Sequence, residues 1–173
     1  METTIINLFA GPGTGKSTTA AGIFHFMKLA GVNAELVTEF PKDLTWSERF
    51  SCLSCQPYIF GEQYYRLYRL VNKVKFIITD SPILLSIIYN KDYPISFNKS
   101  VIDIFNSMNN WNFYLKRGSR PYNPRGRNQT LKEAEQIDEE IVRALLDNRI
   151  PVSTIEADVT AAEKIFQLAI DKP

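Results

Sequence analysis

Short apolar runs alternate with longer amphipathic segments along the whole chain. Each run is rich in β-branched and aromatic residues and is bounded by polar or turn-forming residues, which is typical of buried strands. The runs predict five strands, at residues 4–10, 33–38, 75–79, 111–116 and 152–156. Apolar residues at helical spacing predict helices at residues 15–30, 44–74 (broken near Pro57) and 97–110, and two more that begin near Thr130 and Thr160. Strands that alternate with helices indicate an α/β fold with a mostly parallel five-stranded sheet flanked by helices.

Several of these helices carry sequence signals at their ends. Gly31 follows the first helical segment, and a glycine there favours the left-handed turn that ends a helix. Thr130 and Glu133 have the spacing of a capping box, and Thr160 and Glu163 repeat this spacing near the C-terminus. We therefore expect helices to begin at both threonines.

Composition and charge narrow the classes of function. The 173 residues suit one domain, and no linker or repeat divides the alternation, so we predict a single domain over residues 1–173. Lysine plus arginine number 20 and aspartate plus glutamate 19, and this balance counts against broad nucleic-acid binding, which needs a basic face. No basic leader begins the chain and Asp80 interrupts the longest apolar region, so we expect a cytoplasmic protein without a membrane partner. Whether the chain forms a homodimer is left open.

The strongest chemical signal is A-G-P-G-T-G-K-S at residues 10–17, after the first predicted strand and before the first predicted helix. It fits the Walker A pattern with Ala10 in the first position. The glycines let successive backbone N–H groups face one point, which together with the helix N-terminus forms a nest for phosphate. Lys16 is expected to reach the β- and γ-phosphates of ATP, and Ser17 to bind Mg²⁺. The predicted donor site comprises Gly11, Pro12, Gly13, Thr14, Gly15, Lys16, Ser17 and Thr18.

Two carboxylates follow the second and third predicted strands. In a doubly wound sheet the carboxyl ends of the strands meet at one edge, where ligands bind. Asp80 ends the only strand with the apolar-to-Asp form of a Walker B segment, so we expect it to hold Mg²⁺, directly or through water. The alternative for Asp80 is a helix N-cap, because Ser81 and Pro82 follow. Glu39 is expected to act as a catalytic base or a substrate ligand, with a solvated loop acid as the alternative.

Four arginines lie in the segment 117–129, which glycines and prolines keep irregular. An arginine binds phosphate oxygens bidentately, and a mobile arginine-rich loop can neutralise transferring charge and exclude water. We therefore predict a lid over residues 117–129, with a solvated basic loop as the alternative. The lid arginines predicted to be catalytic are Arg117, Arg120, Arg125 and Arg127.

The segment 56–69 is rich in aromatic residues. Phe60, Gln63 and Tyr64 fall on one helical face. A glutamine amide can pair with the edge of a base and aromatic rings can stack on it, so we predict that these three residues bind the substrate. Core packing of an amphipathic helix is the alternative.

The two cysteines, Cys52 and Cys55, have C-x-x-C spacing. A zinc site needs about four ligands, and the single histidine, His25, is distant in the sequence. We interpret the cysteines as small, semi-buried residues on a helical turn, with a redox pair as the alternative.

Together these segments resemble the P-loop nucleoside and nucleotide kinases, and in particular the small kinase-like P-loop domains often found in bacteriophages, which look like nicotinamide riboside kinase domains. The resemblance covers nearly the whole chain, although only the phosphate loop is a specific motif. The shared features are that loop, the acid Glu39, the helix bearing Gln63, the acid Asp80 and the arginine lid. The resemblance implies a three-layer P-loop NTPase fold, with Lys16 and Ser17 on the phosphates and metal and with Glu39 in the place of the base.

One position departs from the pattern of this superfamily. Deoxynucleoside and thymidylate kinases usually carry an arginine just after the acid of the third strand, whereas Ser81 and Pro82 follow Asp80 here. An acceptor phosphate would have to be bound by other cations, for which the candidates are Arg49, Arg66 and Arg69.

The sequence therefore predicts a Mg-ATP-dependent kinase for a small nucleoside or nucleoside monophosphate acceptor. One alternative is an NTPase without a small-molecule acceptor, of the kind loosely described as AAA. Such machines usually need a helical lid domain, for which we expect no room in 173 residues. The other alternative is a kinase for the 5′-hydroxyl of a nucleic acid, against which the balanced charge counts.

Overall fold

The computed structural model describes residues 2–118, 122 and 129–171. Within these residues the chain forms one five-stranded sheet, in which every neighbouring pair of strands is parallel. The strands are β1 (Thr4–Phe9), β2 (Ala34–Val37), β3 (Phe76–Thr79), β4 (Asn110–Lys116) and β5 (Ser153–Glu156). The helices are α1 (Lys16–Leu29), α2 (Phe40–Trp46), α3 (Phe50–Leu53), α4 (Gln56–Tyr68), the 3₁₀ turn η1 (Ile83–Leu85), α5 (Ser86–Tyr89), α6 (Ile95–Asn106), α7 (Leu131–Asp147) and α8 (Ala161–Ile170).

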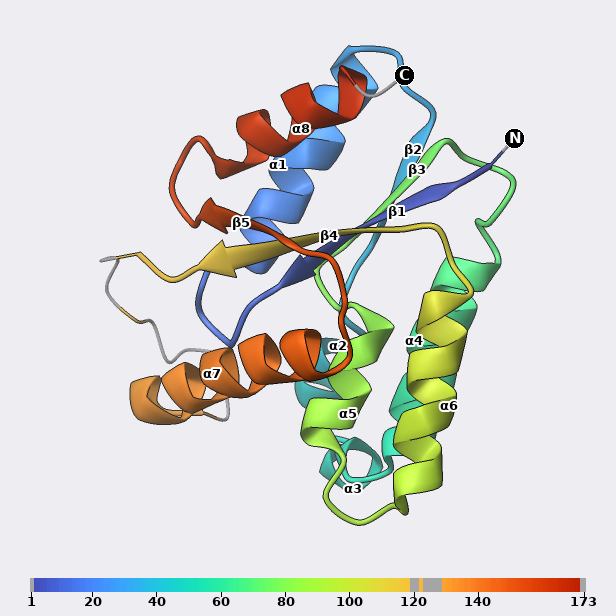
Figure 1. Cartoon of the computed structure of the whole chain (residues 1–173), viewed down its shortest axis with the longest axis vertical. Coiled ribbons are helices and arrows are strands. Elements are labelled where there is room, and N and C mark those ends of the chain that lie inside the picture. The colour runs from blue at the N-terminus through green and yellow to red at the C-terminus, as the bar shows by residue number, and fades with distance from the viewer. Residues whose placement is uncertain (1, 119–121, 123–128, 172–173) are drawn as a thin grey trace.

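Helices cover both faces of the sheet, which makes three layers (Figure 1). On one face α1 and α8 pack against each other and share a hydrophobic cluster with the sheet. On the other face α4, α5, α6 and α7 enclose a second cluster. Strand β1 serves both clusters, because successive side chains of a strand point to opposite faces: Ile6 and Leu8 join the first cluster, and Ile5 and Phe9 the second. The predicted α/β class and the parallel five-stranded sheet are confirmed.

The order of the strands fixes where a ligand site can lie. The sheet runs β2-β3-β1-β4-β5, so β1 is central and the chain turns to either side of it. Crevices at the carboxyl ends of strands form where the strand order reverses in this way. The segment A-G-P-G-T-G-K-S leaves β1 at that edge, and Glu39 and Asp80 follow β2 and β3 at the same edge.

The region predicted as one broken helix over residues 44–74 is three helices, and the first begins earlier, at Phe40. Pro41 and Pro57 each occupy the first turn of a helix, α2 and α4 respectively. A proline lacks a backbone N–H, so it is tolerated in the first turn and disrupts a helix interior. Pro57 therefore marks the start of α4.

The helix-end signals have mixed outcomes. Gly31 has a φ of +71° just after α1, and Thr130 and Glu133 form the complete capping box of α7, as predicted. The second predicted capping box is wrong. The N–H and the hydroxyl of Thr160 both donate to the carboxylate of Asp158, so this local turn replaces the cap.

The cysteines have the expected semi-buried environment. Cys52 lies in α3 and Cys55 precedes α4, both are partly buried, and both are free thiols. Across the described residues, every helix is too short or too polar to cross a bilayer.

Candidate active site

The phosphate loop takes its shape from two glycines with positive φ. Gly13 has a φ of +79° and Gly15 a φ of +106°, a region that side chains other than glycine rarely adopt. Gly15 is the N-cap of α1, so the turn directs the N-terminus of α1 toward the loop. The free N–H groups and the dipole of a helix N-terminus attract anions.

Gly11 is required for a different reason, because helix α7 approaches it closely. A Cβ atom at this position would lie 2.5 Å from the carbonyl oxygen of Ala134. The N–H of Gly11 donates a hydrogen bond of 2.5 Å to Oδ1 of Asp138. Oδ2 of the same carboxylate accepts from Nε of Arg117 at 2.8 Å, and Nη2 of Arg117 donates to the carbonyl of Pro12 at 2.8 Å. Asp138 therefore ties the loop, α7 and the residue after β4 together.

Asp138 is not among the site residues predicted from the sequence, although the residue pattern of α7 contains a signal for it. The buried face of α7 consists of Ala134, Asp138, Ile141 and Leu145, so Asp138 is the one charged residue in an otherwise apolar stripe. Its side chain is almost entirely buried, with the residue 8% exposed. A charge at such a position needs a partner, and Arg117 provides it.

Lys16 lies at the centre of the charges of the site. Its amino group donates to the carbonyl oxygens of Ala10 at 2.6 Å and Gly11 at 3.1 Å. Burial of this amino group lowers the pKa of Lys16, while the negative charges of Glu39, Asp80 and Asp138 oppose that effect. All three carboxylates are therefore close enough to act on one lysine.

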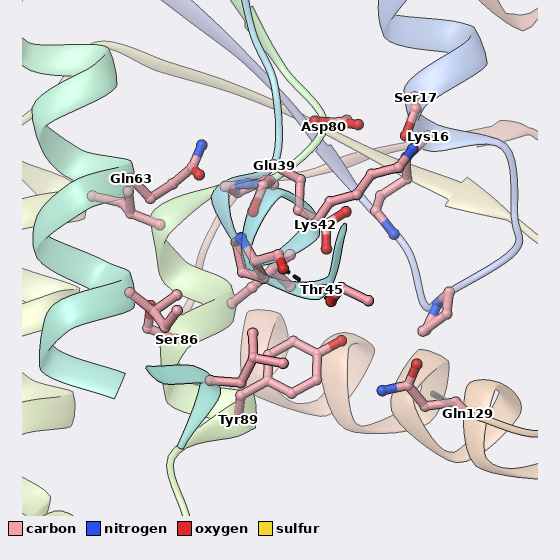
Figure 2. A pocket seen from close by; sticks show the side chains of 18 of the residues that line it. Lys16, Ser17, Glu39, Lys42, Thr45, Gln63, Asp80, Ser86, Tyr89 and Gln129 are labelled. Atoms are coloured by element: carbon pink, nitrogen blue, oxygen red, sulfur yellow. Dashed lines mark hydrogen bonds between the residues drawn. The ribbon is translucent and has the colours of Figure 1, made fainter. Parts of the chain in front are cut away.

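A cavity of about 480 Å³ opens beside the loop. The loop residues that line it are Pro12, Gly13, Gly15, Lys16, Ser17 and Thr18. Glu39, Gln63 and Asp80 line it too, so the structure brings together residues from four predicted segments (Figure 2). Gly11 and Thr14 are buried within the loop instead, where the hydroxyl of Thr14 donates to the carbonyl of Gly11.

Asp80 has the environment of a metal ligand more than that of a helix cap. The residue at the start of η1 is Pro82, and no side chain caps that turn. Asp80 is only 3% exposed, and its Oδ1 atom has no hydrogen-bond partner among the described residues. An orphaned carboxylate oxygen, with the Ser17 hydroxyl on the same cavity, fits the oxygen ligands that Mg²⁺ prefers. Within the described residues no three His, Cys, Asp or Glu side chains gather into a metal cage.

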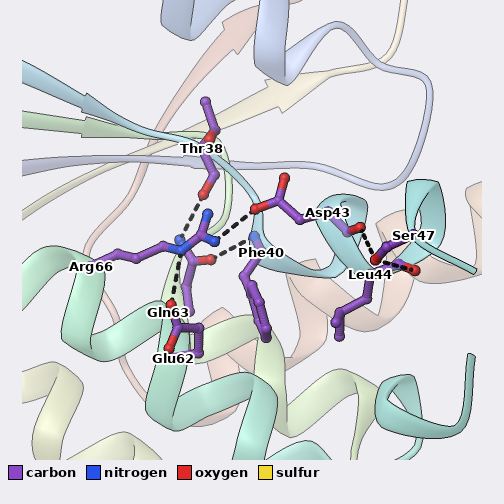
Figure 3. Close-up of polar contacts among 8 residues, drawn as sticks. All are labelled: Thr38, Phe40, Asp43, Leu44, Ser47, Glu62, Gln63 and Arg66. Carbon is purple, nitrogen blue, oxygen red and sulfur yellow. Dashed lines mark hydrogen bonds and ion pairs between the residues drawn. The ribbon is translucent and has the colours of Figure 1, made fainter. Parts of the chain in front are cut away.

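Helix α4 fixes the turn that carries Glu39. The carbonyl oxygen of the Gln63 side chain accepts from the N–H of Phe40 at 2.9 Å, and its NH₂ group donates weakly to the carbonyl of Thr38 at 3.4 Å (Figure 3). One turn further along α4, Arg66 pairs with Asp43 of α2 at 2.7 Å. The amide of Gln63, predicted to bind substrate, is thus bonded to the backbone on both sides of Glu39.

Phe60 and Tyr64, the other predicted substrate residues, pack in the second hydrophobic cluster and lie outside the lining of the cavity. Their rings stack on each other with centroids 6.0 Å apart. The three arginines suggested for an acceptor phosphate are also outside that lining: Arg66 is paired with Asp43 and Glu62, and Arg49 and Arg69 are exposed.

The far wall of the cavity contains residues that the sequence did not single out. Gln56 of α4, Ser86 and Tyr89 of α5, and Lys42 and Thr45 of α2 line it. Figure 2 shows Ser86 and Tyr89 on the side away from Ser17. Burial raises the pKa of the Tyr89 hydroxyl well above its ordinary value, and Glu39 acts in the same direction, so Tyr89 stays a hydrogen-bond donor. No periodic pattern marks these positions, because they become neighbours only through the packing of α2, α4 and α5.

The predicted lid is described only at Arg117, Gly118, Tyr122 and Gln129. Arg120, Arg125 and Arg127 lie outside the described residues, so their predicted roles stay predictions. Arg117 contacts Asp138 and the loop carbonyl of Pro12, while Gln129 lines the cavity.

A protein-family model described as an AAA domain matches residues 5–162. A search of curated proteins found no significant match. Among solved structures, deoxyadenosine kinase from M. mycoides with bound dATP aligns with a TM-score of 0.56 and 18% identity, over 96% of this chain and 99% of that one.

Two further solved structures align over nearly the full length of both chains. APS kinase from Mycobacterium tuberculosis, in complex with AMPPNP and APS, has a TM-score of 0.52 and 11% identity, over 98% of this chain and 96% of that one. Shikimate kinase from Bacteroides thetaiotaomicron has a TM-score of 0.50 and 10% identity, over 97% of each chain. At these identities the likeness shows the fold, and the three-layer P-loop kinase fold expected from the sequence is confirmed.

Proposed function

The chain belongs to the family described as an AAA domain, with the fold of small P-loop kinases, and on that premise we propose that it transfers the γ-phosphoryl group of ATP to a small nucleoside or nucleoside monophosphate. One observation carries the proposal. Lys16 and Ser17 line a cavity of about 480 Å³ whose opposite wall comes from α2, α4 and α5, with Glu39 and Asp80 between. Such a cavity has room beyond a phosphate loop for a second substrate.

The roles of the residues follow from their chemistry. The N–H groups of the loop and the N-terminus of α1 would hold the β- and γ-phosphates, and Lys16 would exchange its carbonyl partners for phosphate oxygens. Ser17 and Asp80 would hold Mg²⁺, which neutralises phosphate charge when bound. The acceptor oxygen forms a bond to the γ-phosphorus, the bond from that phosphorus to the bridging oxygen of ADP breaks, and ADP leaves. Glu39 accepts the proton when the acceptor is a hydroxyl.

Among the described residues that line the cavity, the charges suit a hydroxyl acceptor better than a phosphate. An acceptor phosphate is normally held by bidentate arginines, and no arginine is among the described residues that line the cavity. Lys42 is the one cation of that lining outside the phosphate loop, and it is exposed. Glu39 would repel a second phosphate but would serve a hydroxyl as a base.

The proposal is tested by measuring ADP release with a panel of nucleosides, their 5′-monophosphates and nicotinamide riboside, against an acceptor-free control. We expect at least one nucleoside to raise ADP release. Glu39→Gln should lower that transfer by about a hundredfold or more, as is typical for loss of a general base, with ATP-analogue binding little changed. If no acceptor raises the rate above the control across the panel, the kinase function is refuted.

The alternatives are separated by the same assay. The family description as an AAA domain would also suit an acceptor-independent NTPase. In that case ADP release would be equal with and without acceptors. A kinase for nucleic-acid 5′-hydroxyl groups would respond to oligonucleotides bearing a free 5′-hydroxyl and not to nucleosides.

A further inference from the structure

The two cysteines, Cys52 and Cys55, are joined by one turn of the backbone. The N–H of Cys55 donates to the carbonyl oxygen of Cys52 at 3.2 Å, which closes a turn of four residues. The Cα atoms at the ends of such a turn are less than about 7 Å apart, and a disulfide usually joins Cα atoms about 4.4 to 6.8 Å apart. Both thiols are free and partly buried, so their separation and their access suit a reversible disulfide.

Cys55 has surroundings that favour a thiolate. It is the N-cap of α4, a helix of 13 residues, and the hydroxyl of Tyr93 donates to its Sγ atom at 3.4 Å. Tyr93 is itself fixed, because its N–H donates to the side chain of Asn90 at 2.9 Å. The hydrogen bond from Tyr93, and after it the backbone N–H of Tyr58, lowers the pKa of the Cys55 thiol. Such donors at a helix N-terminus increase the share of the reactive thiolate.

Cys52 has different neighbours. It packs against a small apolar cluster of Phe40, Leu44 and Ile59. The thiolate is the attacking form in disulfide exchange, so the donor at Cys55 assigns the first step to that residue and the second step to Cys52.

The pair lies in a segment that forms part of the cavity wall. Leu53 and Gln56, the residues that follow the two cysteines, both line the cavity. We propose that Cys52 and Cys55 are a thiol–disulfide site beside the cavity, in which Cys55 is the attacking thiolate and a small-molecule disulfide is the oxidant.

With oxidised glutathione as the oxidant, the reaction consists of two exchanges. The Sγ thiolate of Cys55 attacks one sulfur of glutathione disulfide, a mixed disulfide forms, and one glutathione thiolate leaves and takes up a proton. Cys52 then loses its proton to solvent and attacks the Sγ of Cys55, so the bond between Cys52 and Cys55 forms, the mixed disulfide breaks and the second glutathione leaves. Two electrons pass from the two cysteines to glutathione disulfide, and excess dithiothreitol returns them.

The first test follows the intact chain by mass spectrometry after incubation with oxidised glutathione. We expect the mass of the single chain to fall by two hydrogen atoms, without bound glutathione, and to recover after dithiothreitol. Arg49 and Arg66 are consecutive sites for trypsin, so one peptide should contain both cysteines and carry the whole loss. Thiols that stay reduced, two stable glutathione adducts or disulfide-linked dimers would each overturn the proposal.

The second test assigns the attacking thiolate. Cys52→Ser retains Cys55 and should accumulate the mixed disulfide with one glutathione. Cys55→Ser retains Cys52 and should react about tenfold more slowly at neutral pH, because the hydrogen bond from Tyr93 belongs to Cys55. Equal rates in the two variants would refute the role given to Cys55.

The third test concerns Tyr93 and is made in the Cys52→Ser background. Tyr93→Phe keeps the ring that packs on Phe97 and removes the hydroxyl, so the pKa of Cys55 should rise. The pH profile of alkylation by iodoacetamide should therefore shift to higher pH. Tyr65→Phe makes the same change at an exposed position of α4 and should keep the original profile. An unshifted profile in Tyr93→Phe would contradict activation by Tyr93.

All three tests follow thiols and require no phosphoryl transfer. Failure of the kinase assay would therefore leave this proposal standing, and failure of the thiol tests would leave the proposed function standing. If Tyr93→Phe does not fold, the mass of the oxidised wild-type chain still decides whether the pair forms a disulfide.

Discussion

The charged side chains around the phosphate loop have opposing electrostatic effects on one another. Lys16 must be positive to bind a triphosphate, yet burial of its amino group disfavours the charge. Asp138 adds a buried negative charge beside a loop that should attract anions, and Arg117 neutralises it. The ion pair between Asp138 and Arg117 holds the loop and is neutral overall. Lys16 therefore remains the cation of the loop.

The lowered pKa of Lys16 predicts how ATP binding depends on pH. Phosphate binding favours the charged lysine, so affinity should fall as pH rises through the lowered pKa, below the ordinary lysine value of 10.5. We expect the dissociation constant of AMPPNP, measured by calorimetry from about pH 7 to about pH 10, to rise over this range. Lys16→Arg stays charged throughout and should give a flat profile. A wild-type profile as flat as that of Lys16→Arg would contradict the prediction.

Asp138→Asn tests the link between α7 and the phosphate loop. Asparagine keeps the size of the side chain but removes the charge that pairs with Arg117 and the strong acceptor of the Gly11 N–H. We expect the free energy of unfolding to fall by about 2 kcal/mol and AMPPNP to bind about tenfold more weakly. Glu139→Gln, the exposed neighbour on α7, is the matched control and should change neither quantity. Unaltered nucleotide affinity in Asp138→Asn would show that the contacts of Asp138 with Gly11 and Arg117 support only the fold.

At the scale of elements, the structure explains which sequence signals were reliable. The strands were predictable because β1 and β3 are buried on both faces and read as continuous apolar runs. The capping box at Thr130 was predictable because its two partners are three residues apart. At Thr160 the same spacing does not form a box, because the N–H of Thr160 bonds to the carboxylate of Asp158 instead. Gln63 lines the cavity, and its amide also bonds the backbone beside Glu39, a contact that no local pattern encodes.

The junction between β2 and α2 depends on α4 and offers a test at this scale. Gln63→Leu removes the acceptor for the N–H of Phe40, directly beside Glu39. We expect a loss of about 2 kcal/mol in the free energy of unfolding, a raised KM for the acceptor and an unchanged dissociation constant for AMPPNP. Gln136→Leu makes the same chemical change at an exposed position of α7 and should leave all three quantities unaltered. If acceptor KM stays at the wild-type value, Gln63 does not position the acceptor side.

The molecule as a whole brings together residues that are far apart in the sequence. Lys16, Glu39 and Asp80 could be placed at one edge from the sequence alone, because three parallel strands end there. Gln56 and Tyr89 could not, because α4 and α5 reach the cavity only through the packing of the helices. Asp138 could not either, because α7 reaches the phosphate loop in the same way. The sequence therefore places the residues that follow the ends of the strands, but not those that helix packing brings to the cavity and the loop.

This asymmetry leads to a prediction for the intact chain, in which donor and acceptor bind to different walls of one cavity. A ligand that binds only the folded state stabilises it, by about 2.7 kcal/mol at a concentration a hundred times its dissociation constant. For a domain of this size that corresponds to a rise in Tm of roughly 5 to 10 °C.

AMPPNP with Mg²⁺ should produce such a shift in the wild-type protein and almost none in Lys16→Ala. Adding the best acceptor nucleoside should raise the Tm of the wild-type protein further, because the cavity wall formed by α2, α4 and α5 lies outside the phosphate loop. The acceptor alone should still stabilise Lys16→Ala, because its wall is built by α2, α4 and α5. A second shift that is missing in the wild-type protein for every nucleoside would mean that the cavity holds one ligand, as in an acceptor-independent NTPase.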